Sequence, residues 1–197
     1  MTETSGRSAS FQTILDTAER LIEEKGCRQT TLQDIIESSG LSKGAIYHYV
    51  SGKDELFGLI LKSKVEEMNA SFLDAVSAAA RRDATAPIQT IAKGMAEKSD
   101  SADVSNKIFT YLLGQADNPK VSAILGDLYQ YSHQTASRWI ETGQQAGALP
   151  PSVDAAKMAS FFMVITYGLR VQSVITRKGE PPVTMDDITK LIFRTMQ

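Results

Sequence analysis

Residues 31–50 constrain the fold of this chain more than any other segment. Thr31 can cap a helix, with Asp34 three residues later as its capping-box partner, and Gly40 ends the helical pattern before a second capping residue, Ser42. This spacing predicts two short helices joined by a tight turn. Such a pair is typical of a helix-turn-helix, whose second helix enters the major groove of DNA.

The rest of the 197-residue chain also has helical periodicity. Apolar residues recur at spacings of three and four, and glycine, proline and short polar runs separate the periodic segments. No segment alternates like a strand between hairpin turns. We therefore expect an all-α protein of about nine helices: one ending at Gly26, one between Thr31 and Gly40, and others at 43–49, from 53 to about 79, and at 87–98, 103–116, 119–146, 153–177 and 184–196.

The predicted elements divide the chain into three parts. We expect a disordered lead-in at 1–9, a helix-turn-helix DNA-binding domain at 10–54 with its motif at 31–50, and a ligand-binding and dimerisation domain at 55–197. The net charge is −2, so DNA binding would rest on a few placed contacts and not on a broad positive field. A single cysteine, Cys27, excludes an internal disulfide and fits a reducing cytoplasm.

Composition argues against several other classes of protein. Two histidines and one cysteine give no metal-ligand cluster by spacing, and no phosphate-binding glycine loop or nucleophile motif occurs, so we expect no metal, no cofactor and no enzymatic activity. The most apolar run, 158–169, is shorter than the roughly 20 residues that span a bilayer, which predicts no membrane partner.

The second helix of the motif has the side chains that DNA readout requires. Gly44 and Ala45 remove bulk where the helix would approach the bases, and Lys43 can reach a phosphate or a guanine edge. Tyr47 and Tyr49 offer ring faces and hydroxyls, although both could instead half-bury against the first helix. Phosphate contacts from either side complete the candidate set: Thr31, Ser42, Lys43, Gly44, Ala45, Tyr47, His48, Tyr49 and Lys53.

Taken together and in this order, these residues resemble the DNA-binding domain of the TetR family of one-component transcriptional regulators. The match runs from about Phe11 to Leu61 and rests on Ile14-Leu15, Ala18, Gly26, Thr30-Thr31, Asp34-Ile35, the run 40–47, Val50 and the run 53–57. Three positions depart from the family pattern. Phe11 stands where a basic residue is frequent, Tyr49 where histidine is usual, and Val50 where phenylalanine is usual.

The resemblance implies a cytoplasmic homodimer that binds a double-stranded DNA operator, acting as a repressor released by a small apolar or aromatic effector. The family pattern places a ligand pocket among the central helices, and the candidate lining residues are apolar, aromatic or weakly polar. They are Met68, Phe72, Met95, Phe109, Leu112, Tyr129, His133, Trp139, Phe162 and Tyr167. Plain core packing is the alternative for at least half of them.

The last two predicted helices have apolar faces that favour a dimer interface with two helices from each subunit. Its candidate residues are Ala156, Ser160, Met163, Tyr167, Gly168, Val171, Ile175, Ile188, Leu191 and Ile192. Internal packing of the same helices is the alternative. For the whole chain, a helical scaffold or partner-binding protein without DNA readout remains the second hypothesis, because it explains the C-terminal helices but not the motif at 31–50.

Overall fold

The computed structural model describes residues 9–80, 82–176 and 183–195. Within these ranges the all-α prediction is confirmed, with nine helices and no strand. The helices are α1 (Ala9–Gln29), α2 (Leu32–Ser39), α3 (Lys43–Tyr47), α4 (Lys53–Ala78), α5 (Thr85–Ser99), α6 (Val104–Leu113), α7 (Pro119–Gln145), α8 (Ala155–Ile175) and α9 (Met185–Thr195). The predicted lead-in lies outside the described residues except for Ala9, where α1 begins, and the break predicted at 178–182 also lies outside them.

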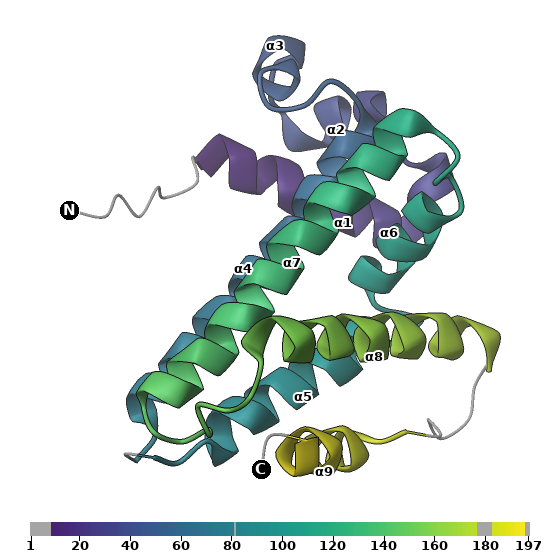
Figure 1. Cartoon of the computed structure of the whole chain (residues 1–197). Helices are drawn as coiled ribbons and strands as arrows, with labels where there is room; N and C mark the ends of the chain where they lie inside the picture. The colour runs from purple at the N-terminus through teal and green to yellow at the C-terminus, as the bar shows by residue number, and fades with distance from the viewer. Residues whose placement is uncertain (1–8, 81, 177–182, 196–197) are drawn as a thin grey trace.

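Two long helices, α4 and α7, run side by side along the length of the molecule (Figure 1). The helices α1, α2 and α3, which include the predicted motif, lie at one end of the molecule, and α5, α8 and α9 lie at the other. At 26 residues and a rise of 1.5 Å per residue, α4 is about 39 Å long. It therefore connects the two ends of the molecule directly.

The two glycines that the sequence marks as helix stops have the left-handed backbone that favours glycine. Gly40 has φ +69° directly after α2, and Gly26 has φ +80° inside the span of α1. The helical backbone thus breaks at Gly26 as predicted, and one further turn follows before Gln29. Both breaks redirect the chain, so that α1, α2 and α3 pack around one small core.

This first core extends beyond the three motif helices. Ile14, Leu15 and Ile22 of α1 pack in one buried cluster with residues from the first half of α4 and with Val104 and Ile108 of α6. A second cluster fills the other end of the molecule, with side chains from α4, α5, α7, α8 and α9. The helix α6 therefore belongs to the core that supports the motif, although it lies some fifty residues later in the sequence.

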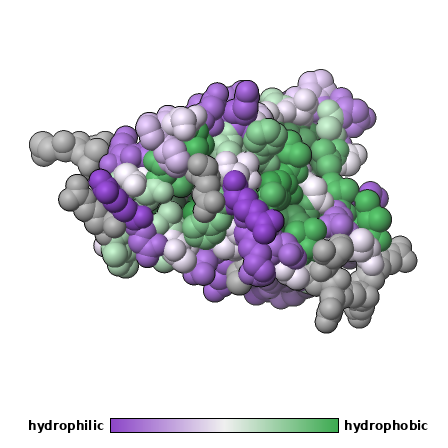
Figure 2. Space-filling model, turned by 60° about the horizontal axis from the view of Figure 1, so that its bottom comes forward, coloured by the Kyte–Doolittle hydropathy of each residue, from purple (hydrophilic) through white to green (hydrophobic). Residues whose placement is uncertain are grey.

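The apolar run at 158–169 lies in the middle of α8, which is slightly shorter than the predicted helix at 153–177. Among the described helices, α8 alone is long and apolar enough, by length and composition, to cross a membrane, and 22% of the relevant window is buried inside the chain. It packs against α5, α6 and α7. One side of α8 remains exposed and apolar, and the underside of the molecule has large hydrophobic areas (Figure 2).

Candidate nucleic-acid interface and internal cavities

The helix α3 stands at the far end of the molecule and presents one face to solvent (Figure 1). Ile46 is fully buried and Val50 is 2% exposed, and these two side chains fix α3 to the first core. On the opposite side Lys43 and Gly44 are exposed, and Tyr47 is 47% exposed. The ammonium of Lys43 lies 5.6 Å from the centre of the Tyr47 ring, so a cation and an aromatic face project together from this surface.

Both ends of α3 are held by local contacts. The hydroxyl of Ser42 accepts a hydrogen bond from the Ala45 N–H at 3.2 Å, which caps the helix start. Ala45 is half-buried, whereas His48 at the helix end is exposed. The helix ends at Tyr47, earlier than the predicted 49. The exposed surface of α3 therefore comprises Lys43, Gly44, Tyr47 and His48, with Ser42 at its edge.

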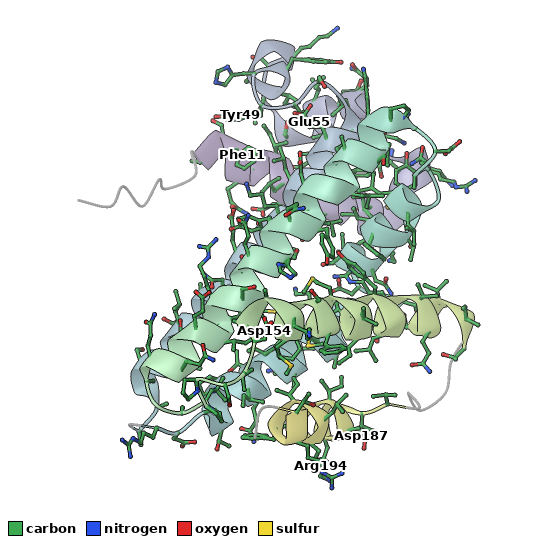
Figure 3. All side chains as sticks on the ribbon, viewed as in Figure 1. Phe11, Tyr49, Glu55, Asp154, Asp187 and Arg194 are labelled. Carbon is green, nitrogen blue, oxygen red and sulfur yellow. The ribbon has the colours of Figure 1, made fainter. Side chains whose placement is uncertain are left out.

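Tyr49 does not lie on the exposed surface of α3. Its ring is half-buried and packs on Phe11 of α1 with the ring centres 5.0 Å apart, and the two residues lie beside each other below α3 (Figure 3). The aromatic pair joins the end of α3 to the start of α1. Two of the three positions that depart from the family pattern thus contact each other, and Tyr49 follows the stated alternative of half-burial against the first helix.

Thr31 is exposed, but both of its hydrogen-bond donors are occupied. Its backbone N–H and its hydroxyl each donate to the Asp34 carboxylate at 2.7 Å, and the Asp34 N–H donates back to the hydroxyl at 3.1 Å. Hydrogen bonds from Lys25 and from Thr31 lower the pKa of Asp34 to about 2. The predicted capping box is present, so a phosphate contact of Thr31 would share these two donors with Asp34.

Lys53 also has an internal role that the sequence did not indicate. Its ammonium donates to the backbone carbonyl oxygens of Cys27, Arg28 and Thr30 at 3.1, 3.3 and 3.2 Å, and it lies 5.2 Å from the centre of the Tyr111 ring. It thereby joins the start of α4 to the end of α1 and to α6. The side chain bridges these helices, so we expect it not to neutralise a phosphate, in contrast to its prediction from the sequence as a DNA contact.

Several acidic side chains near the motif are paired within the protein. Glu19 of α1 bonds Lys64 of α4 at 2.9 Å, and Glu24 bonds Arg20 at 2.8 Å on the same helix. Burial raises the pKa of Glu19 despite the lowering effect of Lys64. These pairs balance two of the acidic charges of α1 within the protein.

Comparison with known proteins agrees with this geometry. The family model described as "Bacterial regulatory proteins, tetR family" matches residues 14–60, from α1 into α4. The HTH-type transcriptional regulator YfiR of Bacillus subtilis is 28% identical over 186 residues, covering 93% of this chain and 89% of YfiR. The chain belongs to the TetR family of transcriptional regulators.

Other TetR-family proteins share parts of the sequence or the whole fold. The transcriptional repressor KstR2 of Rhodococcus jostii is 28% identical over 123 residues, covering 56% of this chain and 59% of KstR2. The crystal structure of a TetR transcription regulator from Haloarcula marismortui has a TM-score of 0.66 at 19% identity and covers 95% of this chain and 96% of that one. These relatives are transcriptional regulators by name. The match of the family model over the helix-turn-helix and the curated relatives together identify this protein as a DNA-binding transcriptional regulator.

The C-terminal helices of this TetR-family chain enclose two adjacent cavities. The central cavity, of about 750 Å³ with its open mouth included, lies among α4, α5, α6, α7 and α8. Of the predicted lining residues, it is lined by Met68, Met95, Phe109, Trp139, Phe162 and Tyr167. The adjacent cavity, of about 660 Å³ with its mouth, is lined by Phe72, and Trp139 and Phe162 separate the two.

Three predicted lining residues lie elsewhere. Leu112 is fully buried in the first core, where α6 meets the motif helices. Tyr129 and His133 lie on the side of α7 that faces α8, and the His133 Nε2 atom is 3.0 Å from the Ala156 carbonyl oxygen and 3.1 Å from the Ser160 hydroxyl. These corrections have one cause: periodicity identifies the apolar side of a helix but not the neighbour that it meets.

Three basic side chains at the central cavity were missed from the sequence. Lys64, Lys98 and Arg170 all line it, and no acidic side chain of the described residues does. A sequence signal existed for one of them, because Arg170 is the one charged residue in the stretch of α8 from Met158 to Ile175. A charged residue at such a position is costly unless it has a partner.

The predicted dimer residues divide into exposed and internal sets. Ala156, Gly168, Val171, Ile175 and Leu191 are exposed, and Ser160 is half-buried beside His133. The others are internal, which corrects their prediction: Met163 and Tyr167 line the central cavity, and Ile188 and Ile192 are each 1% exposed in the second core, where α9 packs on α5.

Two further observations concern metal ligands and the cysteine among the described residues. No group of three histidine, cysteine, aspartate or glutamate side chains is placed there to hold a metal ion. Cys27 is buried, and burial raises the pKa of its thiol to about 11. The thiol is therefore protonated and poorly nucleophilic at neutral pH.

Proposed function

We propose that the protein is a homodimeric cytoplasmic repressor, without enzymatic activity, that binds a double-stranded operator through α3. A small apolar or aromatic effector, bound in the cavities of the C-terminal helices, releases it from the operator. The family and the relatives' names support regulation of transcription, and KstR2 is itself a repressor by name.

The exposed face of α3 is the observation that carries the DNA-binding proposal. This face presents Lys43 and Tyr47 around Gly44, at the extreme end of the molecule. The small glycine allows close approach to base edges, while the lysine binds a phosphate or guanine and the tyrosine ring contacts a thymine methyl.

Binding to DNA from upstream of the protein's own gene tests this assignment. We expect a salt-sensitive complex by fluorescence anisotropy, abolished in the Lys43→Ala/Tyr47→Ala double variant without a change in melting temperature. The matched control is Lys93→Ala, because Lys93 is an equally charged, 65% exposed side chain on α5, remote from α3. Normal binding by the double variant would refute the assignment of α3 as the recognition helix.

An exposed apolar stripe on α8 supports the dimer. Phe161, Val164, Gly168, Val171 and Ile175 are all exposed and follow one another at spacings of three and four residues, so they lie on one face of the helix. Val164 and Ile175 are each 70% exposed, which is unusual for such side chains on a monomer. Two copies joined along this stripe would place two α3 helices on one DNA duplex, as half-sites about 34–36 Å apart require.

Sedimentation equilibrium tests the dimer. We expect Val164→Glu to give a monomer and to weaken operator binding, because a carboxylate in the apolar seam would be buried without a partner. Leu73→Glu is the matched control, since Leu73 is 49% exposed on α4 outside the stripe. A wild-type monomer, or a dimer that tolerates Val164→Glu, would refute this interface.

Contacts between the cavity and the motif support effector control. Phe109 lines the central cavity and also packs in the first core with α1, so an effector that displaces its ring acts on the support of the motif. Two residues further along α6, the Tyr111 hydroxyl donates to the Asp54 carboxylate at 3.3 Å and its ring lies under Lys53. A shift of α6 is thereby passed to the start of α4.

The length of α4 amplifies such a shift. With a helix of about 39 Å, a tilt of about 5° moves the end next to α3 by roughly 3 Å. In a dimer the two recognition helices would move in opposite directions, so the distance between them would no longer match the distance between the two half-sites. An effector that binds the conformation with the mismatched spacing more tightly than the DNA-bound conformation therefore shifts the population away from the operator.

A further inference from the structure

We infer that the central cavity is built for an elongated organic anion, with an apolar body among α4, α5 and α7 and a carboxylate held by Arg170 and Lys98. The inference rests on the proposed effector cavity and specifies its chemistry. It replaces a neutral apolar or cationic compound, which the apolar and aromatic composition alone would favour. The charges at one end of the cavity make the difference.

Arg170 is the centre of that charged end. Its guanidinium is largely buried, donates one hydrogen bond to the Ser105 carbonyl oxygen at 3.0 Å and lies 5.1 Å from the centre of the Phe109 ring. Burial lowers its pKa to about 10, so it still carries its charge at neutral pH. Among the described residues no carboxylate lies within 4 Å of it, and a planar fork of donors is the natural partner of a carboxylate.

Lys98 adds a second cation of the same kind. It lines the cavity from the end of α5, is half-buried, and forms no ion pair with a described residue. Lys64 lines the cavity too, but its charge is balanced by Glu19 and Glu67 at 2.9 and 3.2 Å. The Asp103 carboxylate interacts electrostatically with Arg170 but does not line the cavity. The wall itself therefore has an excess of positive charge from Lys98 and Arg170, and no carboxylate on that wall balances it.

The protein next to Arg170 is also unusually polar for a buried place. Asn106, fully buried, donates to the Ser99 carbonyl oxygen, the Arg170 carbonyl oxygen and the Ser173 hydroxyl at 2.8, 3.2 and 2.9 Å. The Ser99 Oγ, Ser105 Oγ and Asn106 Oδ1 atoms have no hydrogen-bond partner in the described part of the protein. Buried polar groups without partners are costly, and these three concentrate next to Arg170 and the end of α5.

The rest of the cavity suits an apolar body. Its wall away from Arg170 is formed by Met68, Met95, Trp139 and Phe162, flexible or flat apolar side chains that adapt to a chain or a ring. Trp139 donates to the Asn69 side-chain oxygen at 2.9 Å and separates the central cavity from the adjacent one. A ligand with its carboxylate at Arg170 would extend toward this indole.

The single tryptophan of the chain gives a direct assay, because Trp139 lies on the wall of the cavity. We would titrate the full-length protein, without DNA, with three amphiphiles that have alkyl chains of nine or ten carbons and differ in the charge of their head group: decanoate, decan-1-ol and decyltrimethylammonium. Decanoate should change Trp139 fluorescence at a concentration at least about tenfold lower than either of the other two compounds requires, because its carboxylate gains a charge-assisted hydrogen bond. Equal or tighter binding of the alcohol or the ammonium compound, or no response to any of the three, would overturn the inference.

Two variants locate the carboxylate. Arg170→Gln should weaken decanoate by about tenfold or more, and Lys98→Met by a smaller factor, while both leave decan-1-ol binding unchanged. Lys98→Met has the safer fold, because Lys98 has no hydrogen bond or ion pair with the described residues, and Lys93→Met on the same helix is the matched control. Unchanged decanoate affinity in both Arg170→Gln and Lys98→Met would refute the site.

Operator release is measured separately. If decanoate binds with the expected dependence on charge but leaves the operator complex intact, the ligand chemistry stands and the proposed release of a repressor fails. If an unrelated neutral compound releases the operator while decanoate does not bind, the proposed release stands and the ligand chemistry fails.

Discussion

Lys53 offers the sharpest test of how the structure supports DNA binding. In Lys53→Met the side chain keeps its bulk beside Tyr111, but the three hydrogen bonds from its ammonium to the carbonyl oxygens of Cys27, Arg28 and Thr30 are removed. Hydrogen bonds to a charged group contribute about 1.5–3 kcal/mol when they are isolated. Because these three share one half-buried ammonium, we expect the free energy of unfolding to fall by about 2–3 kcal/mol in total.

For a chain of this size that decrease lowers the melting temperature by about 5–10 °C, which differential scanning calorimetry resolves easily. The dependence of operator affinity on salt separates this role from binding to a phosphate. Each phosphate that a lysine neutralises adds about 0.9 to the slope of log K against log salt. In Lys53→Met we expect the slope of log K against log salt to stay as in the wild-type protein. In the control Lys43→Met we expect this slope to fall by about 0.9 while the melting temperature stays unchanged.

The opposite pair of results would refute this reasoning. If Lys53→Met melts like the wild-type protein and its salt slope falls by about 0.9, the ammonium neutralises a phosphate and its three hydrogen bonds to carbonyl oxygens contribute little.

Three further predictions concern other parts of the chain. Cys27, buried and with its pKa raised to about 11, should not react with iodoacetamide at pH 7.5 until the protein is denatured, as mass spectrometry would show, and rapid labelling would contradict this. The lowered pKa of Asp34 stabilises the fold at pH values above 3.8, the ordinary pKa of aspartate, and this stabilisation disappears as the pH falls toward 2. Asp34→Asn should therefore lower the melting temperature at pH 7 and differ less from the wild-type protein at pH 3. The same difference in melting temperature at both pH values would argue against this. A Cβ at Gly58 would lie 2.5 Å from Ile124 Cγ2, so Gly58→Ala should push α4 from α7, lowering the melting temperature and weakening operator binding, whereas Gly126→Ala, with open space around its Cβ position, should do neither.

The fold could be predicted largely from local chemistry. Caps such as Thr31 with Asp34 and the stop at Gly40 act over a few residues, so the sequence contains their whole explanation. The predicted start of α4 at Lys53 and of α7 at Pro119 agree with the structure for the same reason. The sites were harder, because they depend on which helices meet.

Long-range pairing explains the corrections. No local pattern indicates that Lys53 reaches back 26 residues to a carbonyl of Cys27, or that α9 buries Ile188 against α5. The exposed stripe on α8 was within reach, because Phe161 and Val164 continue the spacing of Gly168 and Val171. It was obscured because nearly every side of this helix is apolar, so periodicity could not separate the side facing the protein from the side facing solvent.

The shared core has a practical consequence for building chimeric regulators. The α6 side chains Val104, Ile108 and Leu112 belong to the cluster that holds α1 and α4. A fragment that ends near residue 60 lacks them, so the sides of α1 and α4 that pack on α6 would be exposed to water. Joining the first 60 residues to the effector domain of another regulator would therefore leave the recognition helix on an incomplete support. A transplant that includes the α6 side chains, or matches them in the recipient, should keep the operator specificity intact.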